Sequence, residues 1–266
     1  MHLAGGGVRM TPDDVVRHTK DVVTEAGAAF GHDPLYRARG RQLGLSRWPF
    51  YFGGRAGVLG EVGPEVVAAA CGFFAPDLVH DSWDAARAAL PLAAIVRADV
   101  EECARWARTV YGGLPGLERL AGLAEMVVAA AEPAGLPLFA AWRAHVVQDG
   151  DPAARAGLAL LRLREHRGGC HLTAVLAHGL TPLTTILAGP GVGKAEANGW
   201  RLPWPALPPG SAAALVGARR LTDQLAAAPY AALTPAERAD LVDLLGQVGE
   251  AHRRHRQSLA AGTDLK

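Results

Sequence analysis

The chain has 266 residues, and half of them are hydrophobic, which argues against a disordered chain and provides enough apolar side chains for a sizeable core. The 27 Lys and Arg residues against 26 Asp and Glu give a formal net charge of +1, which argues against a surface built throughout for nucleic acid or acidic membrane. Three cysteines without paired spacing, and a start without the features of a secretory signal, indicate a cytoplasmic protein with no membrane-spanning segment.

Helix start signals recur along the chain, whereas the alternating pattern of strands is scarce. At Thr11 and Pro12, and again at Thr234 and Pro235, a capping residue precedes a proline suited to the first helical turn. These signals, together with the spacing of apolar residues, predict a mostly α-helical protein. The predicted helices cover residues 12–29, 64–74, 99–111, 116–132, 152–167, a segment from 182 onwards and 235–256.

Two stretches have the pattern of a helix-turn-helix unit, in which short helices are joined by a three- or four-residue turn that contains glycine. Residues 48–59, a turn at 60–63 and the helix from Pro64 form the first, and residues 171–178, a turn at 179–181 and the helix from Pro182 form the second. Small helical bundles show the same pattern. Residues 136–150 and 189–210 are predicted as irregular linkers, so a boundary near Gly150 divides the chain into halves at 11–150 and 151–260.

The first candidate site is a segment without acidic residues, between Asp33 and Glu61. Arginine offers paired donors to carboxylate or phosphate, and aromatic faces stack against flat ligands. The segment therefore predicts either a pocket for an anionic or aromatic small molecule, with Trp48, Tyr51 and Arg55 as ligand-binding residues, or a contact with nucleic acid. The alternative is an aromatic core helix with solvated arginines at its edge. The segment contains Arg37, Arg39, Arg41, Arg47 and Arg55 together with Tyr36, Trp48, Phe50, Tyr51 and Phe52.

The second candidate site is residues 164–171, where two glycines, Gly168 and Gly169, are expected to break a helix. A histidine beside a carboxylate suits acid–base catalysis, and the start of the next helix would attract an anion. Metal binding through His166, Cys170 and His171 is not favoured, because the spacing matches no zinc signature. Alternatively, the histidines and Arg167 cap two helix ends. The predicted catalytic residues are Glu165, His166 and His171, and Arg167 is predicted to bind the ligand.

Residues 186–195 look like a phosphate-binding loop but lack two of its requirements. Ala188 stands where the loop needs glycine, and Ala195 stands where a Ser or Thr would bind magnesium. Nucleotide hydrolysis is therefore not predicted. The basic cluster at 252–256 is expected to be a solvated helix end.

Three groups of residues carry a resemblance to a known family. They are residues 48–56 with the run Tyr-Phe-Gly-Gly-Arg-Ala, residues 163–171, and the closing segment 226–245. The chain resembles a large actinobacterial family of helix-turn-helix proteins with tandem winged-helix-like halves. The resemblance implies two such halves packed together. Family members commonly have Gly-Asp-Gly-His where this chain has residues 168–171, and the proline-rich residues 201–210 imply a shortened wing in the second half.

Two functions remain open from the sequence. The first is a small-molecule-binding protein, expected to be a cofactor-free acid–base enzyme of specialised metabolism (a lyase, isomerase or hydrolase) with its site between the two halves. The alternative is a ligand-responsive winged-helix regulator that binds DNA as a homodimer. The position of the arginines distinguishes them, since DNA binding needs one exposed basic face and ligand binding needs cations directed into a cavity.

Overall fold

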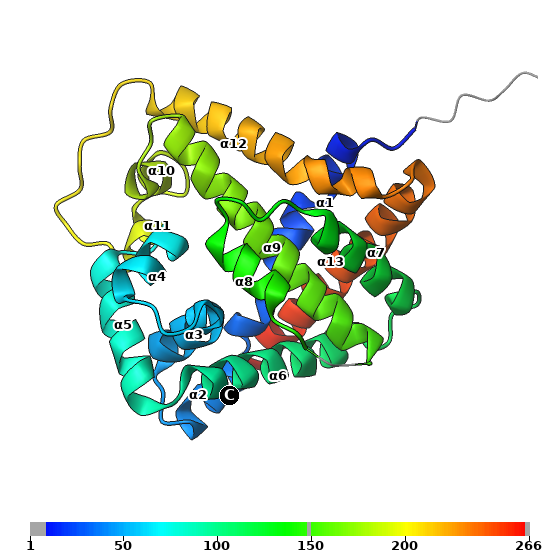
Figure 1. Ribbon diagram of the computed structural model, residues 1–266, viewed down its shortest axis with the longest axis horizontal. Coiled ribbons are helices and arrows are strands. Elements are labelled where there is room, and N and C mark those ends of the chain that lie inside the picture. The colour runs from blue at the N-terminus through cyan, green and yellow to red at the C-terminus, as the bar shows by residue number, and fades with distance from the viewer. Residues whose placement is uncertain (1–8, 148–149, 264–266) are drawn as a thin grey trace, which may run out of the picture.

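The computed structural model describes residues 9–147 and 150–263. Over these ranges the chain forms α-helices and short 3-10 helices but no strand, which confirms the mostly α-helical prediction (Figure 1). The α-helices are α1 (Pro12–Ala26), α2 (Pro34–Gln42), α3 (Arg47–Ala56), α4 (Pro64–Cys71), α5 (Pro76–Ala89), α6 (Leu92–Tyr111), α7 (Leu117–Ala130), α8 (Pro137–Ala144), α9 (Pro152–Ala177), α10 (Pro182–Ala188), α11 (Val192–Ala197), α12 (Ser211–Ala227) and α13 (Pro235–Thr263). The 3-10 helices are η1 (Ala29–His32), η2 (Gly57–Leu59) and η3 (Ala228–Ala232).

Helix α9 is the central element, and Figure 1 shows it running diagonally through the middle of the molecule. It packs against α1, α6, α7, α8 and α12. Leu158, Leu160, Leu161 and Leu163 are all buried, so the helix is apolar around its circumference, as expected of a helix surrounded by others. All the site residues predicted in the second half, residues 165–167 and 171, lie on this one helix.

The largest hydrophobic core takes residues from both predicted halves. It joins Val15 and Val23 of α1 and Leu120 of α7 to Leu160 of α9 and Leu245 of α13. The first helix also packs directly against α12 and α13, at the other end of the chain. The division into 11–150 and 151–260 therefore stays a prediction.

Both predicted helix-turn-helix units form, although the first helix of the second unit is longer than expected. The first forms as expected, with α3 and η2, a turn at residues 60–63 and then α4. In the second, the expected break at Gly168 and Gly169 is wrong, because α9 continues through both glycines to Ala177. A Cβ atom at Gly169 would lie 2.7 Å from Leu136 Cδ2, so this glycine allows close packing and does not end the helix. The turn before α10 starts at Gly179, whose φ of 70° suits glycine.

The predicted linkers contain short helices that the sequence reading did not anticipate. Helix α8 lies within 136–150, and α11 lies within 189–210. Pro137 occupies the first turn of α8, where its missing N–H costs nothing. In the described part of the chain neither unit is followed by a β-hairpin, so the wing expected to be shortened in the second half is absent there, and residues 198–210 form a loop.

Within the described residues, no single helix combines the length and the apolar character needed to cross a membrane. Helices α9 and α10 meet that requirement only as a pair, and they are bent by 93° at the break between them.

Candidate functional site

A cavity of about 170 Å³ opens beside α3, and its lining residues come from several segments between Gly27 and Asn198. Residues 27–36, α3, α6, α9 and α11 all contribute to its walls. The volume is comparable to the roughly 150 Å³ of an engineered cavity that admits benzene. Of the seven residues predicted for the site, Trp48, Tyr51, Arg55 and Glu165 line this cavity, and the other three do not.

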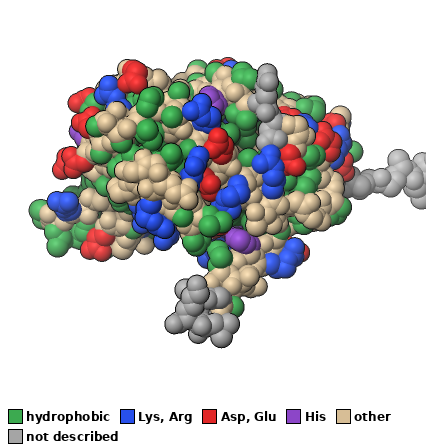
Figure 2. All heavy atoms as spheres, turned by 90° about the horizontal axis from the view of Figure 1, so that it is seen from below, with side chains coloured by type: hydrophobic (Ala, Val, Ile, Leu, Met, Phe, Trp, Pro, Cys, Tyr) green, Lys and Arg blue, Asp and Glu red, His purple; other side chains and the backbone are tan. Residues whose placement is uncertain are grey.

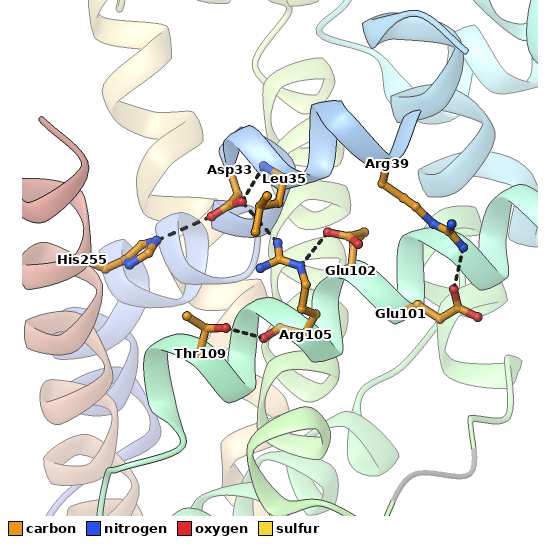
Figure 3. A network of polar contacts seen from close by, with 8 residues as sticks. All are labelled: Asp33, Leu35, Arg39, Glu101, Glu102, Arg105, Thr109 and His255. Atoms are coloured by element: carbon orange, nitrogen blue, oxygen red, sulfur yellow. Dashed lines mark hydrogen bonds and ion pairs between the residues drawn. The ribbon is translucent and has the colours of Figure 1, made fainter. Parts of the chain in front are cut away.

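The wall formed by residues 27–36 is held in place by a network of polar contacts (Figure 3). Asp33 caps α2, because its Oδ1 accepts a hydrogen bond of 2.8 Å from the backbone N–H of Leu35. Arg105 of α6 reaches the same oxygen at 3.2 Å and bonds Glu102 at 2.8 Å. His255 of α13 lies 3.5 Å from Asp33 Oδ2. Helices α6 and α13 thus hold the start of α2 beside the cavity.

Aromatic rings form one side of the cavity. The rings of Trp48 and Tyr51 from α3 lie 5.7 Å and 5.6 Å from that of Phe74, and 5.8 Å from each other. Edge and tilted contacts of this kind are favourable, and the Trp48 ring is also stacked with Phe52 at 5.9 Å. Phe50 and Phe52 of the same helix are fully buried. Both interpretations of this segment therefore apply, since two of its five aromatics, Phe50 and Phe52, belong to the core, and the other three line the cavity.

Arg55 and Glu165 join the two segments singled out in the sequence. The guanidinium group donates two hydrogen bonds to the carboxylate, at 2.8 Å and 2.9 Å, and a third to the hydroxyl of Tyr51 at 3.2 Å. Arg164 also donates to Glu165. Burial alone would raise the pKa of Glu165, but the two guanidinium groups lower it to about 2. Glu165 is thus ionised at neutral pH, and its geometry suits an ion pair better than proton transfer.

His166, Arg167 and His171 lie on other sides of α9. His166 packs edge-on against Phe139 and its Nε2 lies 3.8 Å from the sulfur of Cys170. His171 stacks on Phe73 and its Nδ1 lies 3.0 Å from Thr222 Oγ1. Arg167 donates to Asp223 at 2.6 Å. Consecutive residues of a continuous helix point about 100° apart, so this run cannot converge on one cavity.

The two imidazoles are neutral at pH 7. Burial lowers the pKa of His166 to about 4, and burial together with Arg167 lowers that of His171. Within the described residues, no group of three or more His, Cys, Asp and Glu side chains is placed to hold a metal ion.

A group of cations at the cavity is the feature that the sequence analysis missed. Arg47 lies 4.4 Å from the centre of the Trp48 ring, and neither Arg47 nor Lys194 forms an ion pair with any described residue. His32, Arg47, Arg164 and Lys194 all line this cavity, and the pKa of His32 is lowered by burial and by these three cations. Lys194 belongs to the segment that fails as a phosphate-binding loop, so its position beside a cavity had no signal in the sequence.

The second missed feature is a buried carboxyl group in the cavity wall. Asp99 of α6 is 2% exposed, and its Oδ1 accepts a hydrogen bond of 2.7 Å from the hydroxyl of Tyr36. Burial raises the pKa of Asp99 to about 7, although the Tyr36 hydrogen bond acts in the opposite direction. A carboxylate on the apolar face of α6, near Ile95 and Cys103, is the signal that could have revealed it.

The surfaces that could contact DNA carry few unpaired cations. The exposed residues of α4 include Glu65 and Val66 but no Lys or Arg. The five arginines of the acid-free segment are divided: Arg37 and Arg41 are exposed on α2, Arg39 pairs with Glu101 at 3.0 Å, and Arg47 and Arg55 line the cavity, where Arg47 is exposed and Arg55 is largely buried. On the face seen in Figure 2, basic and acidic side chains are interspersed. The arginines thus form no single basic face.

Comparison with known protein families gives a match that covers most of the chain. A family model described as a helix-turn-helix family matches residues 16–258, a range that includes every residue lining the cavity. No curated protein and no solved structure matches the chain.

Proposed function

Because the chain belongs to the helix-turn-helix family, we propose that it is a ligand-binding member of that family, whose cavity takes a small anionic molecule with a flat apolar part. The observation that carries the proposal is the excess of cations over an aromatic wall. Arg47, Arg55, Arg164 and Lys194 line the cavity, and among the described lining residues Glu165 is the one carboxylate that is fully ionised at neutral pH, since Asp99 has a pKa of about 7. Arg55 and Arg164 share that carboxylate, which leaves Arg47 and Lys194 for a ligand.

The chemistry of these groups defines the ligand class. A guanidinium and an ammonium group bind carboxylate or phosphate through charge-assisted hydrogen bonds. The rings of Trp48, Tyr51 and Phe74 favour a flat apolar body. Both requirements are met by an aromatic carboxylate.

Benzoate and benzamide test the proposal, because they share a shape and differ in charge. Calorimetric titration at pH 7 should give tighter binding of benzoate, and the variant R47Q/K194Q should lose about tenfold in benzoate affinity, the usual scale for charged hydrogen bonds. The control R41Q/R220Q removes two exposed cations outside the cavity and should bind benzoate as the parent does. Absent benzoate binding, or equal loss in both variants, would refute the proposal.

The acid–base enzyme predicted from Glu165, His166 and His171 has weaker support. The two imidazoles lie outside the cavity that contains Glu165. The reaction class therefore stays a prediction, and ligand binding is the function that the cavity supports best.

The family match favours a second candidate function, a DNA-binding regulator, over catalysis. Its support is the match itself and the helix-turn-helix unit formed by α3 and α4. Such a protein would work in the cytoplasm as a homodimer and would change its DNA affinity when the cavity is filled. Fluorescence anisotropy with labelled promoter fragments, titrated with salt, tests this function, because phosphate contacts weaken steeply as salt rises. Absent binding at low salt would exclude it.

A further inference from the structure

The inference in this subsection rests on the proposed function and extends it to the uncharged end of the ligand. We infer that Asp99 and Tyr36 recognise a polar substituent of the bound molecule, with Asp99 in its acid form donating a hydrogen bond to a carbonyl-type acceptor. The ligand is then a molecule with two polar ends, an anion that meets Arg47 and Lys194 and an acceptor that meets Asp99.

The hydrogen bonds of Asp99 show where its proton resides. Oδ1 accepts from the Tyr36 hydroxyl at 2.7 Å, and Oδ2 has no hydrogen-bond partner among the described residues. In the neutral acid one oxygen carries the proton and the other is a carbonyl acceptor. Because Tyr36 occupies Oδ1 as an acceptor, the proton belongs on Oδ2. Asp99 lines the cavity, so this O–H is a donor that a ligand can use.

The neutral form of Asp99 follows from its surroundings. It is buried beneath α3 and α9, and burial is the largest influence on its pKa, which it raises to about 7. The charged groups nearby offset one another, since Glu165 raises the pKa while Arg164 and Arg55 lower it. The titratable and charged groups that face Asp99 are Tyr36 of α2, Arg55 of α3, Cys103 of α6, and Arg164 and Glu165 of α9.

Gly54 allows α3 to approach Asp99 closely enough to form this wall. A Cβ atom at that position would lie 2.5 Å from Asp99 Oδ1 and 2.7 Å from its Cγ. No real Cβ atom tolerates such contacts, so any larger residue would displace the carboxyl group from Tyr36. The absence of a side chain at Gly54 therefore leaves room for the Asp99 carboxyl group in the orientation that bonds Tyr36.

This arrangement predicts a pH-dependent specificity. Below pH 7 the neutral carboxyl donates to a carbonyl acceptor on the ligand. Above pH 7 Asp99 ionises, the donor is lost, and the carboxylate repels the acceptor. The preference for acceptor-bearing ligands should therefore fall as pH rises through 7.

The test compares 4-acetylbenzoate with 4-isopropylbenzoate, which match in the number of heavy atoms and in charge and of which only the first has a carbonyl acceptor. The parent protein should bind the acetyl compound about three- to tenfold more tightly at pH 6, the scale of one hydrogen bond, and should lose this ratio at pH 8. Because both probes carry the same carboxylate, titration of His32 or of the probes cancels from the ratio.

The variant D99N provides the decisive control. Asparagine keeps the Oδ1 acceptor for Tyr36 and presents an N–H donor where the neutral acid has its O–H. D99N should therefore keep the acetyl preference at both pH 6 and pH 8. The control E118Q removes a carboxylate charge from α7 that pairs with Arg155 outside the cavity, and it should behave as the parent does.

Each outcome separates this inference from the proposed function. A ratio in the parent protein that does not change with pH, or a D99N ratio that falls with pH as in the parent, would overturn the role of Asp99 while the cavity remains a ligand site. The first of these results needs no variant, so misfolding of D99N cannot obscure it. Failure of all three benzoates to bind would overturn the proposed function itself.

Discussion

Polar residues on the two sides of α9 have different surroundings. On one side, Arg164 and Glu165 join Arg55 at a cavity in which Arg47 and Lys194 have no acidic partner. On the other, His166, Arg167 and His171 are each engaged by a neighbour from the packed interior. Adjacent residues of one sequence run thus serve different purposes. This difference shows that consecutive polar residues on a continuous helix face different neighbours. They should be assigned to one side of the helix or the other before they are grouped into one site.

The largest effect should come from removing the charge that pairs with Arg55. In E165Q the buried guanidinium loses its counter-ion, and loss of one partner of a buried pair costs about 3–5 kcal/mol. Urea denaturation at pH 7 measures the loss. The control E118Q breaks an exposed pair with Arg155 and should cost less than about 0.5 kcal/mol. Equal losses of unfolding free energy in E165Q and E118Q would contradict a buried ion pair between Arg55 and Glu165.

The next effect concerns the pH dependence of stability, where Asp99 and Glu165 have opposite signs. The pKa of Asp99 is about 7 in the folded protein against 3.8 for the free group, so its folded state holds the proton and stability falls as pH rises from about 4 to 7. Glu165 has a folded pKa of about 2, so its contribution is lost only as pH falls below 4.5.

Urea denaturation of D99N at pH 5 and pH 8 isolates the first of these contributions. Asparagine mimics the neutral acid, so the variant should be more stable than the parent at pH 8, by roughly 2–4 kcal/mol for a shift of this size, and the gain should shrink at pH 5. A stability change that is the same at both pH values would contradict the buried neutral carboxyl.

A smaller effect on stability should distinguish Gly54 of α3 from Gly168 of α9. In G54A the new methyl group would overlap Asp99, and overpacking of this kind costs about 1–3 kcal/mol. In G168A the methyl group meets open space on the exposed side of α9, so the variant should gain about 0.5–1 kcal/mol from helix propensity. Thermal unfolding of the two variants measures the difference in stability. Destabilisation by G168A would contradict the open surroundings of Gly168.

The smallest effect is expected on ligand affinity in H171A. The histidine stacks on Phe73 and lies outside the cavity, so benzoate affinity should stay within about twofold of the parent, less than the loss of one hydrogen bond. The same titration calorimetry measures it. A loss of tenfold or more would restore His171 to the site that the sequence analysis assigned to it.

The sequence predicts the elements of this fold better than their ends. Capping signals locate the starts of α1, α4, α9, α10 and α13, because Thr–Pro, Gly–Pro and Asp–Pro pairs act locally. The glycines of α9 mislead, because burial of the helix among its neighbours outweighs their low helix propensity. The same tertiary contacts make a helix of residues 137–144, which local punctuation marks as a linker.

The site follows the same rule. Trp48, Tyr51, Arg55 and Glu165 could be named from local chemistry, since charge and aromatic rings gather in two short segments. Lys194 and His32 could not, because they come from separate segments, α11 and η1, that only the fold brings to one cavity. Asp99 had one local signal, a carboxylate on the apolar face of α6. What the sequence shows is which segments carry chemistry, and the fold decides which side chains share a cavity.

The central claim is that the cavity selects an anion. Titration calorimetry of the unmodified protein with benzoate and with benzamide at pH 7 tests it most directly, because the two probes are alike in size and shape and only benzoate carries a negative charge. We predict that benzoate binds about tenfold more tightly than benzamide, through Arg47 and Lys194. Equal affinity for the two probes, or tighter binding of benzamide, would contradict the claim.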